Sequence, residues 1–310
     1  SSLIRYAKMF SLNEYSGEPA AGCQHPPRCG GRHESAEAGT AMAPQASPRN
    51  RRETMGGLAK GLEVIRAFTR EQPALTLSQV ATSAGLSPAT ARRCLHTLEE
   101  LGYVMRRDRS FLLRPKVLEL GAAYLESMNI EAVTGNLLEE LARQTGDSAA
   151  LAVLDGAEIV YVARASVRTL LRLEAHVGSR LPAYPTSMGR VLLAGLSPER
   201  LKSYLATVRL EPLTERTVTD AKRLGRLLDE CRRNGYAAVE DELAYGVVAL
   251  AVPVVAAAGR VVAALNISSH SRRTSKAKLV RERLAMLRDV SRQLSRELAR
   301  LPGLSLSAQL

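Results

Sequence analysis

Aromatic residues are scarce in this chain. Its 310 residues include no Trp, three Phe and nine Tyr, although 45% of all residues are hydrophobic. The hydrophobic cores must therefore be built mainly from Leu, Val, Ile and Ala. A single core usually stops growing at about 250–300 residues, so a chain of this length is long enough for two domains.

Long apolar runs are also absent. No stretch reaches the roughly 18 consecutive apolar residues that a transmembrane helix needs. The first residues, SSLIRYAKMFSLNEYSGEPAAG, lack the basic start and continuous apolar stretch of a signal peptide. We therefore expect a cytoplasmic protein without a membrane partner.

Cysteine is rare, and the four present are not spaced like metal ligands. Cys23 and Cys29 enclose five residues in CQHPPRC, which is not a zinc-knuckle spacing, and Cys94 and Cys231 stand alone. We expect neither a metal nor a cofactor.

The motifs of common enzyme classes are missing as well. The sequence has no P-loop, no HExxH and no GxSxG, and its cysteines and five histidines form no recognisable nucleophile–base spacing. An enzyme is therefore the weaker hypothesis, and we expect a binding protein.

Positive charge is plentiful and unevenly distributed. The net charge is +12. Residues 55–120 carry ten Lys and Arg against six Asp and Glu, and residues 272–310 carry ten against three, whereas residues 121–271 carry sixteen against seventeen. The basic excess at the two ends indicates a polyanion partner, although a basic helix can also be a solvated face.

Residues 55–113 have the element order of a winged helix-turn-helix domain. A helix over residues 58–68, whose inner face carries Leu58, Leu62, Ile65 and Val64 or Phe68, precedes a short helix that ends at Gly85. Ser87 and Pro88 then begin a longer helix as N-cap and first residue. Two short strands follow, joined by the turn RRDRS. This order is typical of DNA-binding proteins in which the second helix of the motif enters the major groove.

The longer helix, within LSPATARRCLHTLEELGYV, has two distinct faces. Ala91, Cys94, Leu95 and Leu98 fall in one arc and are expected to pack inward. The opposite face is basic or neutral over its first two turns. A solvated face would also fit, but the position in the motif and the arginines of the hairpin favour contact with DNA. The residues expected at the DNA are Ser87, Ala89, Thr90, Arg92, Arg93, His96 and Thr97 of the helix and Arg106, Arg107 and Arg109 of the hairpin.

The rest of the chain indicates a linker and a second domain. We expect disorder over residues 1–54, a linker helix over 114–129 with a dimer seam of Val117, Leu118, Ala122 and Leu125, an effector-binding domain over 130–302 and a flexible tail over 303–310. In the second domain, alternating strands, including a hairpin around Asp155-Gly156, are interleaved with helices. The fold class is therefore α+β, with a GAF- or PAS-like mixed effector domain built on an antiparallel sheet.

The strings ATARRCLHTLEELGYV, LRPKVLELGAAYL, RLPAYPTSMGRVLLAGL and VVAALNISSH resemble the IclR-type transcriptional regulators. The resemblance extends over about residues 57–301, and RRCLHTL and LPAY-x-TSMGR look most like its aromatic-acid branch. It implies a DNA-binding regulator, associated with the nucleoid, whose second domain senses a small carboxylate. β-Ketoadipate, protocatechuate and 4-hydroxybenzoate are the candidate acids.

The resemblance also implies where the effector binds. We expect Ser187 to cap the helix begun by TSMGR, whose first N–H groups would face an anion, and Asn266 and Ser268 to share one strand face. Arg164 is a further candidate for neutralising a carboxylate. The effector-binding residues expected are Tyr184, Thr186, Ser187, Met188, Gly189, Glu240, Ala249, Asn266 and Ser268.

The expected partners are a near-palindromic DNA duplex, a small carboxylate and a second copy of the chain, in a homodimer or tetramer, with RNA polymerase as a further candidate. Two alternatives stay open: a regulator of the same family that responds to an unrelated small acid, and a non-specific DNA binder.

Overall fold

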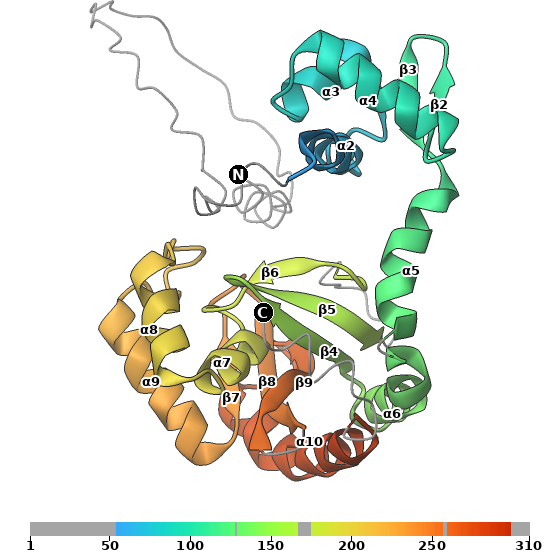
Figure 1. Cartoon of the computed structure of the whole chain (residues 1–310). Coiled ribbons are helices and arrows are strands. Elements are labelled where there is room, and N and C mark those ends of the chain that lie inside the picture. The colour runs from blue at the N-terminus through green and yellow to red at the C-terminus, as the bar shows by residue number, and fades with distance from the viewer. Residues whose placement is uncertain (1–53, 128, 167–174, 257–258, 299–310) are drawn as a thin grey trace, which may run out of the picture. The chain divides into compact units, whose positions relative to one another are not determined.

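The computed structural model describes residues 54–127, 129–166, 175–256 and 259–298 (Figure 1). Contacts between residues divide these segments into two compact units that meet in the chain between Leu120 and Gly121. The expectations for residues 1–53, for the tail and for Cys23 and Cys29 lie outside the described residues.

The first unit has the predicted helix, short helix, helix and hairpin. Its elements are α2 (Gly56–Arg66), β1 (Ala74–Thr76), α3 (Leu77–Ser83), α4 (Pro88–Glu100), β2 (Val104–Arg107) and β3 (Ser110–Leu113). The strands form an antiparallel sheet in the order β1-β3-β2. The short strand β1 was not predicted, because only its pairing with β3 makes Ala74–Thr76 extended.

The inner face predicted for α2 is wrong in part. Val64 is fully buried, and Ile65 and Phe68 pack against the same core. Leu58 and Leu62, however, are 62% and 46% exposed. The packed side of α2 is set by its contacts with α4 and α3, which the helical period alone does not specify.

The chain leaves the first unit through a 3-10 turn, η2 (Pro115–Val117), followed by α5 (Leu118–Ser127). Asn129, at a φ of +46°, separates α5 from α6 (Ile130–Thr145). Leu125 of α5 packs on the core of the second unit. This residue is therefore already engaged within its own chain, whereas Leu118 is 75% exposed.

The second unit is built on one six-stranded antiparallel sheet in the order β6-β5-β4-β9-β8-β7. The strands are β4 (Ser148–Asp155), β5 (Glu158–Ala165), β6 (Arg180–Pro182), β7 (Ala237–Glu240), β8 (Val247–Val255) and β9 (Val261–His270). The hairpin predicted around Asp155-Gly156 is confirmed by the β4–β5 register. The strand β6 lies at one edge of the sheet, next to β5.

Helices cover both faces of this sheet (Figure 1). One face is covered by α7 (Ser187–Ala194), against which α9 (Ala221–Asn234) packs. Together with α8 (Pro198–Thr207), these helices share a core with Ala152, Ala251 and Ala264. The other face carries α6 and α10 (Lys276–Leu298), which pack on Leu151, Leu250 and Leu265. The fold is the predicted helix-turn-helix domain followed by an α+β domain with an antiparallel sheet.

No helix in the described part of the chain is both long enough and apolar enough to span a membrane.

Candidate functional site

The helix α4 begins where its sequence predicted. The Ser87 hydroxyl accepts a hydrogen bond from the backbone N–H of Thr90, at 3.3 Å between N and Oγ, and donates to the Thr90 hydroxyl at 2.9 Å. Pro88 occupies the first turn, where its missing N–H costs nothing. These contacts hold both hydroxyls at the exposed N-terminal end of α4.

The two faces of α4 also separate as predicted. Ala91, Leu95 and Leu98 are buried. Arg92 and Arg93 are exposed, and neither has an acidic partner among the described residues. His96 is exposed, and its Nδ1 lies 3.6 Å from a carboxylate oxygen of Glu100. The exposed face also includes Ala89 and Thr97.

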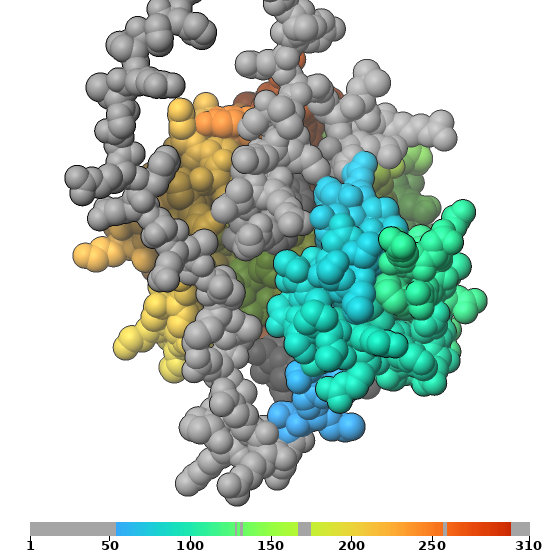
Figure 2. Space-filling model, turned by 90° about the horizontal axis from the view of Figure 1, so that it is seen from above, coloured from blue at the N-terminus to red at the C-terminus, as the bar shows by residue number. Residues whose placement is uncertain are grey.

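The hairpin β2–β3 adds further positive charge. Arg107 and Arg109 are exposed, and within the described residues no acidic group pairs with them. Arg106 Nε donates to the carbonyl of Asp108 at 3.1 Å, and Asp108 has a φ of +55°. Arg106 therefore stabilises the turn that projects Arg107 and Arg109. Figure 2 shows the surface of this unit from α2 in blue to the hairpin in green.

This arrangement can bind a polyanion. Exposed guanidinium groups at the start of a helix and on an adjacent hairpin suit base edges and phosphate oxygens, respectively. The structure brings all ten sequence-predicted residues of this site onto α4, its cap and the hairpin.

A second polar site lies at the start of α7. The predicted cap, Ser187, is wrong: Thr186 caps the helix, because its hydroxyl accepts from the N–H of Gly189 at 3.0 Å and donates to the Ala183 carbonyl at 3.0 Å. Ser187 is instead the first helical residue. Its side chain is 1% exposed, and among the described residues its hydroxyl has no hydrogen-bond partner.

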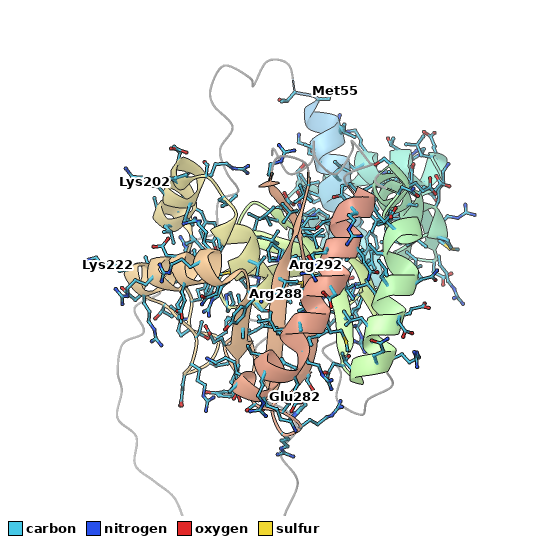
Figure 3. All side chains as sticks on the ribbon, turned by 90° about the horizontal axis from the view of Figure 1, so that it is seen from below. Met55, Lys202, Lys222, Glu282, Arg288 and Arg292 are labelled. Atoms are coloured by element: carbon cyan, nitrogen blue, oxygen red, sulfur yellow. The ribbon has the colours of Figure 1, made fainter. Side chains whose placement is uncertain are left out.

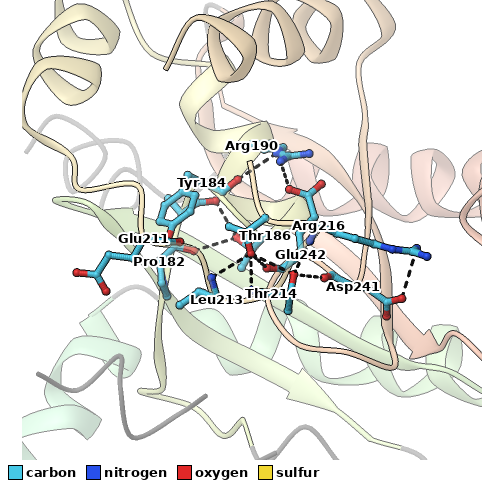
Figure 4. Close-up of polar contacts among 12 residues, drawn as sticks. Pro182, Tyr184, Thr186, Arg190, Glu211, Leu213, Thr214, Arg216, Asp241 and Glu242 are labelled. Atoms are coloured by element: carbon cyan, nitrogen blue, oxygen red, sulfur yellow. Dashed lines mark hydrogen bonds and ion pairs between the residues drawn. The ribbon is translucent and has the colours of Figure 1, made fainter. Parts of the chain in front are cut away.

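The turn that leads into α7 is fixed by buried polar contacts (Figure 4). The Tyr184 hydroxyl donates to the Glu211 carbonyl at 2.6 Å, and burial raises the pKa of this phenol to about 12. Arg190 Nε donates to the Tyr184 carbonyl at 3.0 Å, and a terminal nitrogen of Arg190 forms an ion pair with Glu242. The Arg190 and Glu242 side chains are only 5% and 12% exposed.

Two loops meet beside this turn (Figure 4). The Thr214 and Thr217 hydroxyls donate to the carbonyls of Asp241 and Glu242, respectively, each at 2.6 Å. Since the side chain of Glu242 also holds Arg190, both loops and the start of α7 form one connected network.

The strand face below α7 carries the other polar residues of the site. Ala150 of β4 lies opposite Arg164 of β5 on one side and Asn266 of β9 on the other, so these residues share a face. Ser268 lies opposite Ala249 on the same face. This face is the one covered by α7, because Ala150 packs in the same core as Met188 and Val191.

Two side chains on this face have contrasting contacts. Asn266 is 4% exposed, and its Oδ1 finds no partner within the described part of the chain. Arg164 donates to the carbonyl of Ala175. Buried polar groups are nearly always hydrogen-bonded, so the orphan oxygens of Ser187 and Asn266 are consistent with a ligand site.

Glu240 does not lie with these residues. It pairs with Val248, which belongs to the core on the α10 side of the sheet. A Glu240 carboxylate oxygen accepts a hydrogen bond from the backbone N–H of Lys276, the first residue of α10, at 3.3 Å. The structure therefore contradicts its predicted place at the effector site, because the alternation of β7 points it to the opposite face.

The start of α7 can hold an anion. The first N–H groups of a helix have no intrahelical acceptor, and within the described residues no acceptor contacts the N–H of Ser187 or Met188. The site therefore offers an anion these two N–H donors and the Ser187 hydroxyl. The polar side chains of the strands lie on the sheet face that α7 covers.

Comparison with known proteins identifies the fold. Residues 57–108 match the IclR helix-turn-helix domain, and residues 122–296 match the bacterial transcriptional regulator IclR C-terminal domain. The chain belongs to the IclR family of bacterial transcriptional regulators.

Two bacterial regulatory proteins are similar to this chain over most of their length. The Pca regulon regulatory protein of Pseudomonas putida is 40% identical over 84% of this chain and 93% of its own length. The p-hydroxybenzoate hydroxylase transcriptional activator of Acinetobacter baylyi is 36% identical over 81% of this chain and 95% of its own.

Solved structures of a transcriptional regulator and of an IclR homologue agree with the fold. A transcriptional regulator from Rhodococcus sp. RHA1 has a TM-score of 0.73 and 42% identity over 80% of this chain and 100% of its own. An IclR homologue from Microbacterium hydrocarbonoxydans, complexed with 4-hydroxybenzoate, has a TM-score of 0.67 and 27% identity over 78% of this chain and 99% of its own. This IclR-family chain is a transcriptional regulator rather than an enzyme.

Sequence reasoning missed Arg190 and Glu242 of this IclR-family fold. The pair joins residues 52 apart in the chain, so no local spacing indicates it. The only available signal was a charged residue, Arg190, within the otherwise apolar helix sequence SMGRVLLA.

Proposed function

We propose that this regulator binds a near-palindromic operator as a homodimer and changes its affinity for that operator when a small carboxylate binds its second domain. The buried hydroxyl of Ser187 at the start of α7, which has no hydrogen-bond partner among the described residues, is the observation that most supports the effector part. Arg92 and Arg93, which are exposed and have no acidic partner in the part of the chain that the structure describes, support the DNA part.

In this proposal α4 contacts base edges and the hairpin contacts phosphates. A guanidinium of Arg92 or Arg93 can donate two hydrogen bonds to guanine, which discriminates against the wrong base by about 1–3 kcal/mol. Arg107 and Arg109 suit phosphate oxygens, which fix position without distinguishing sequence.

Mobility-shift titrations at several salt concentrations test these roles. The titrations use an operator selected by the wild-type protein and a scrambled duplex. Arg93→Ala should reduce the preference for the operator by about tenfold or more. Arg107→Ala should weaken binding to both duplexes. It should also lower the slope of log affinity against log salt by about 0.9, the value for one phosphate contact. Unchanged binding in both variants would remove this assignment, and equal wild-type affinity for both duplexes would favour a non-specific binder.

The effector is proposed to lie between the start of α7 and the polar face of β9 and β4. Its carboxylate would accept hydrogen bonds from the N–H groups of Ser187 and Met188 and from the Ser187 hydroxyl. Asn266 and Ser268 would bond its other polar group. The cationic Arg164 on the same face would favour a negative charge there.

An aromatic-pathway acid is the effector class we favour. The supports are the names of relatives at 36–40% identity, which concern the pca regulon and p-hydroxybenzoate hydroxylase, and the 4-hydroxybenzoate bound to the Microbacterium homologue. An unrelated small acid is the alternative. Tyr184 already donates its hydroxyl to Glu211, so it would contribute its ring rather than a hydrogen bond.

A thermal-shift screen against β-ketoadipate, protocatechuate, 4-hydroxybenzoate and quinate tests the effector class. Ser187→Ala should weaken binding of the active acid by about tenfold, because a hydrogen bond to a charged group is lost. Ser203→Ala, on the exposed surface of α8, makes the same chemical change away from the site and should have no effect. If no acid at millimolar concentration shifts the melting temperature, the aromatic-acid proposal fails while the DNA proposal stands.

The proposed dimer would place two copies of α4 in successive major grooves, about 34–36 Å apart. The exposed Leu58 and Leu62 of α2 and Leu118 of α5 offer apolar surface for a second copy. A tetramer and contact with RNA polymerase are extensions of the same proposal.

A further inference from the structure

Lys116 is exposed in a basic DNA-binding unit, yet its ammonium group is engaged within the protein. Nζ donates to the carbonyl oxygen of Leu101 at 3.1 Å, across 15 residues of sequence. It also lies 5.3 Å from the centroid of the Tyr103 ring, within the range of a cation–π interaction.

The acceptor is special because Leu101 is the C-cap residue of α4. The last carbonyls of a helix lack intrahelical donors, and the negative end of the helix dipole attracts a cation. Gly102, at a φ of +81°, turns the chain sharply here, and the Tyr103 N–H donates to the Leu98 carbonyl at 2.8 Å. The Lys116 ammonium therefore supplies the Leu101 carbonyl with a hydrogen-bond donor.

A second contact ties the same two segments together. The N–H of Arg114 donates to the carbonyl of Tyr103 at 2.8 Å. The hairpin β2–β3 lies in sequence between these tied ends, at Leu101–Tyr103 and Arg114–Lys116. These two contacts therefore connect the C-terminal end of α4 directly to the segment that follows the hairpin, at the start of the linker.

We propose that Lys116 is a positioning residue that fastens the linker to the C-terminal end of α4 and thereby orients α4 on the operator, rather than a residue that contacts DNA phosphate. Without this contact, η2 and the segment that leads into α5 could shift against α4. Orientation matters for specific binding, because base-edge hydrogen bonds need exact geometry, whereas non-specific phosphate contacts tolerate small displacements.

Salt dependence distinguishes the two roles. A lysine that contacts a phosphate releases a counterion, so its removal lowers the slope of log affinity against log salt by about 0.9 and weakens binding to any duplex. A lysine that only positions α4 leaves the slope unchanged and affects the operator selectively.

The experiment compares the full-length wild-type protein with Lys116→Met, which keeps the aliphatic stem but lacks the donor. Both are titrated at several salt concentrations with a duplex selected by the wild-type protein and with its scrambled counterpart. Operator affinity should fall by about threefold to tenfold, as expected for loss of a charge-assisted hydrogen bond, with scrambled affinity and salt slope unchanged. Arg107→Ala is the control that should lower the slope.

Two results would overturn the proposal: a slope that falls by about 0.9 with equal losses on both duplexes, or an operator affinity that does not change. Tyr103→Leu provides a second variant, because it removes the aromatic face without altering charge. It should weaken operator binding in the same selective way, and circular dichroism should show that both variants remain folded.

Discussion

Gly189 shows at the scale of one residue how closely α7 approaches the turn before it. A Cβ added at this position would stand 2.0 Å from the carbonyl oxygen of Ala183, a distance that no backbone tolerates. The same carbonyl accepts the hydroxyl of the helix cap, Thr186. A side chain here would therefore displace the cap and the N–H groups at the start of α7.

We expect Gly189→Ala to destabilise the second unit by about 1–3 kcal/mol, as overpacking in a close-packed region does, and to abolish effector binding. Gly225→Ala is the matched control, because nothing lies within 4 Å of its added Cβ in α9. Alanine there should stabilise the helix by about 0.5–1 kcal/mol. Urea unfolding monitored by circular dichroism gives both values, and equal stabilities for the two variants would contradict this account.

At the scale of elements, the C-terminal end of α6 is clamped to the turn that follows β9 and to α10. Arg273 and Arg283 donate to the carbonyls of Gly146 and Thr145 at 3.0 and 3.2 Å. Both guanidinium groups also approach the Asp147 carboxylate, at 3.9 and 3.8 Å, and Asp147 is 5% exposed. The cations thus satisfy the end of α6 and a buried acid together.

Asp147→Asn should lower the free energy of unfolding of the second unit by about 1–3 kcal/mol, because a buried charge partner of two arginines is lost. Asp229→Asn makes the same change in an exposed ion pair with Arg232 and should cost no more than about 0.5 kcal/mol. Urea titrations of both variants measure the difference. An equally small effect for Asp147→Asn would show that the clamp contributes nothing to stability.

The charged side chains of α10 contrast with this buried clamp. Figure 3 labels Glu282, Arg288 and Arg292 on α10, which covers the face of the sheet opposite α7. Arg288 donates to the carbonyl of Asn234 at 2.7 Å and so holds the end of α9, while Arg292 pairs locally with Asp289. Part of the basic C-terminal charge noted in the sequence therefore serves internal contacts rather than a polyanion.

At the scale of the whole molecule, the exposed leucines of α2 offer the apolar surface for the proposed second copy. Leu58 and Leu62 lie one helical turn apart, and Met55, labelled in Figure 3 at the start of α2, is 77% exposed. Apolar side chains grouped in this way mark interaction surfaces more often than isolated ones do.

Replacing both Leu58 and Leu62 with Gln should raise the dimer dissociation constant at least about tenfold, because each leucine contributes about 1.5–3 kcal/mol when fully buried. Sedimentation velocity over a concentration series measures this change. Leu101→Gln alters a leucine that is also exposed, at 53%, but lies outside α2, and it should leave the dimer intact. A wild-type protein that stays monomeric would contradict the proposed dimer.

Much of this protein is determined by local sequence. The cap at Ser87, the two faces of α4, the turn at Asp155-Gly156 and the alternation of the central strands follow from residue spacing and backbone preference, which act over a few residues. The resemblance to the IclR-type regulators, carried by strings such as ATARRCLHTLEELGYV, implied a transcriptional regulator, and the comparisons confirm it.

Tertiary structure alone decided the rest. It turned Glu240 to the face of α10 and left Leu58 and Leu62 exposed. It also paired Arg190 with Glu242 and Lys116 with Leu101. The physical reason is common to all: each outcome depends on which surface a segment packs against, and contacts between residues distant in sequence set that choice.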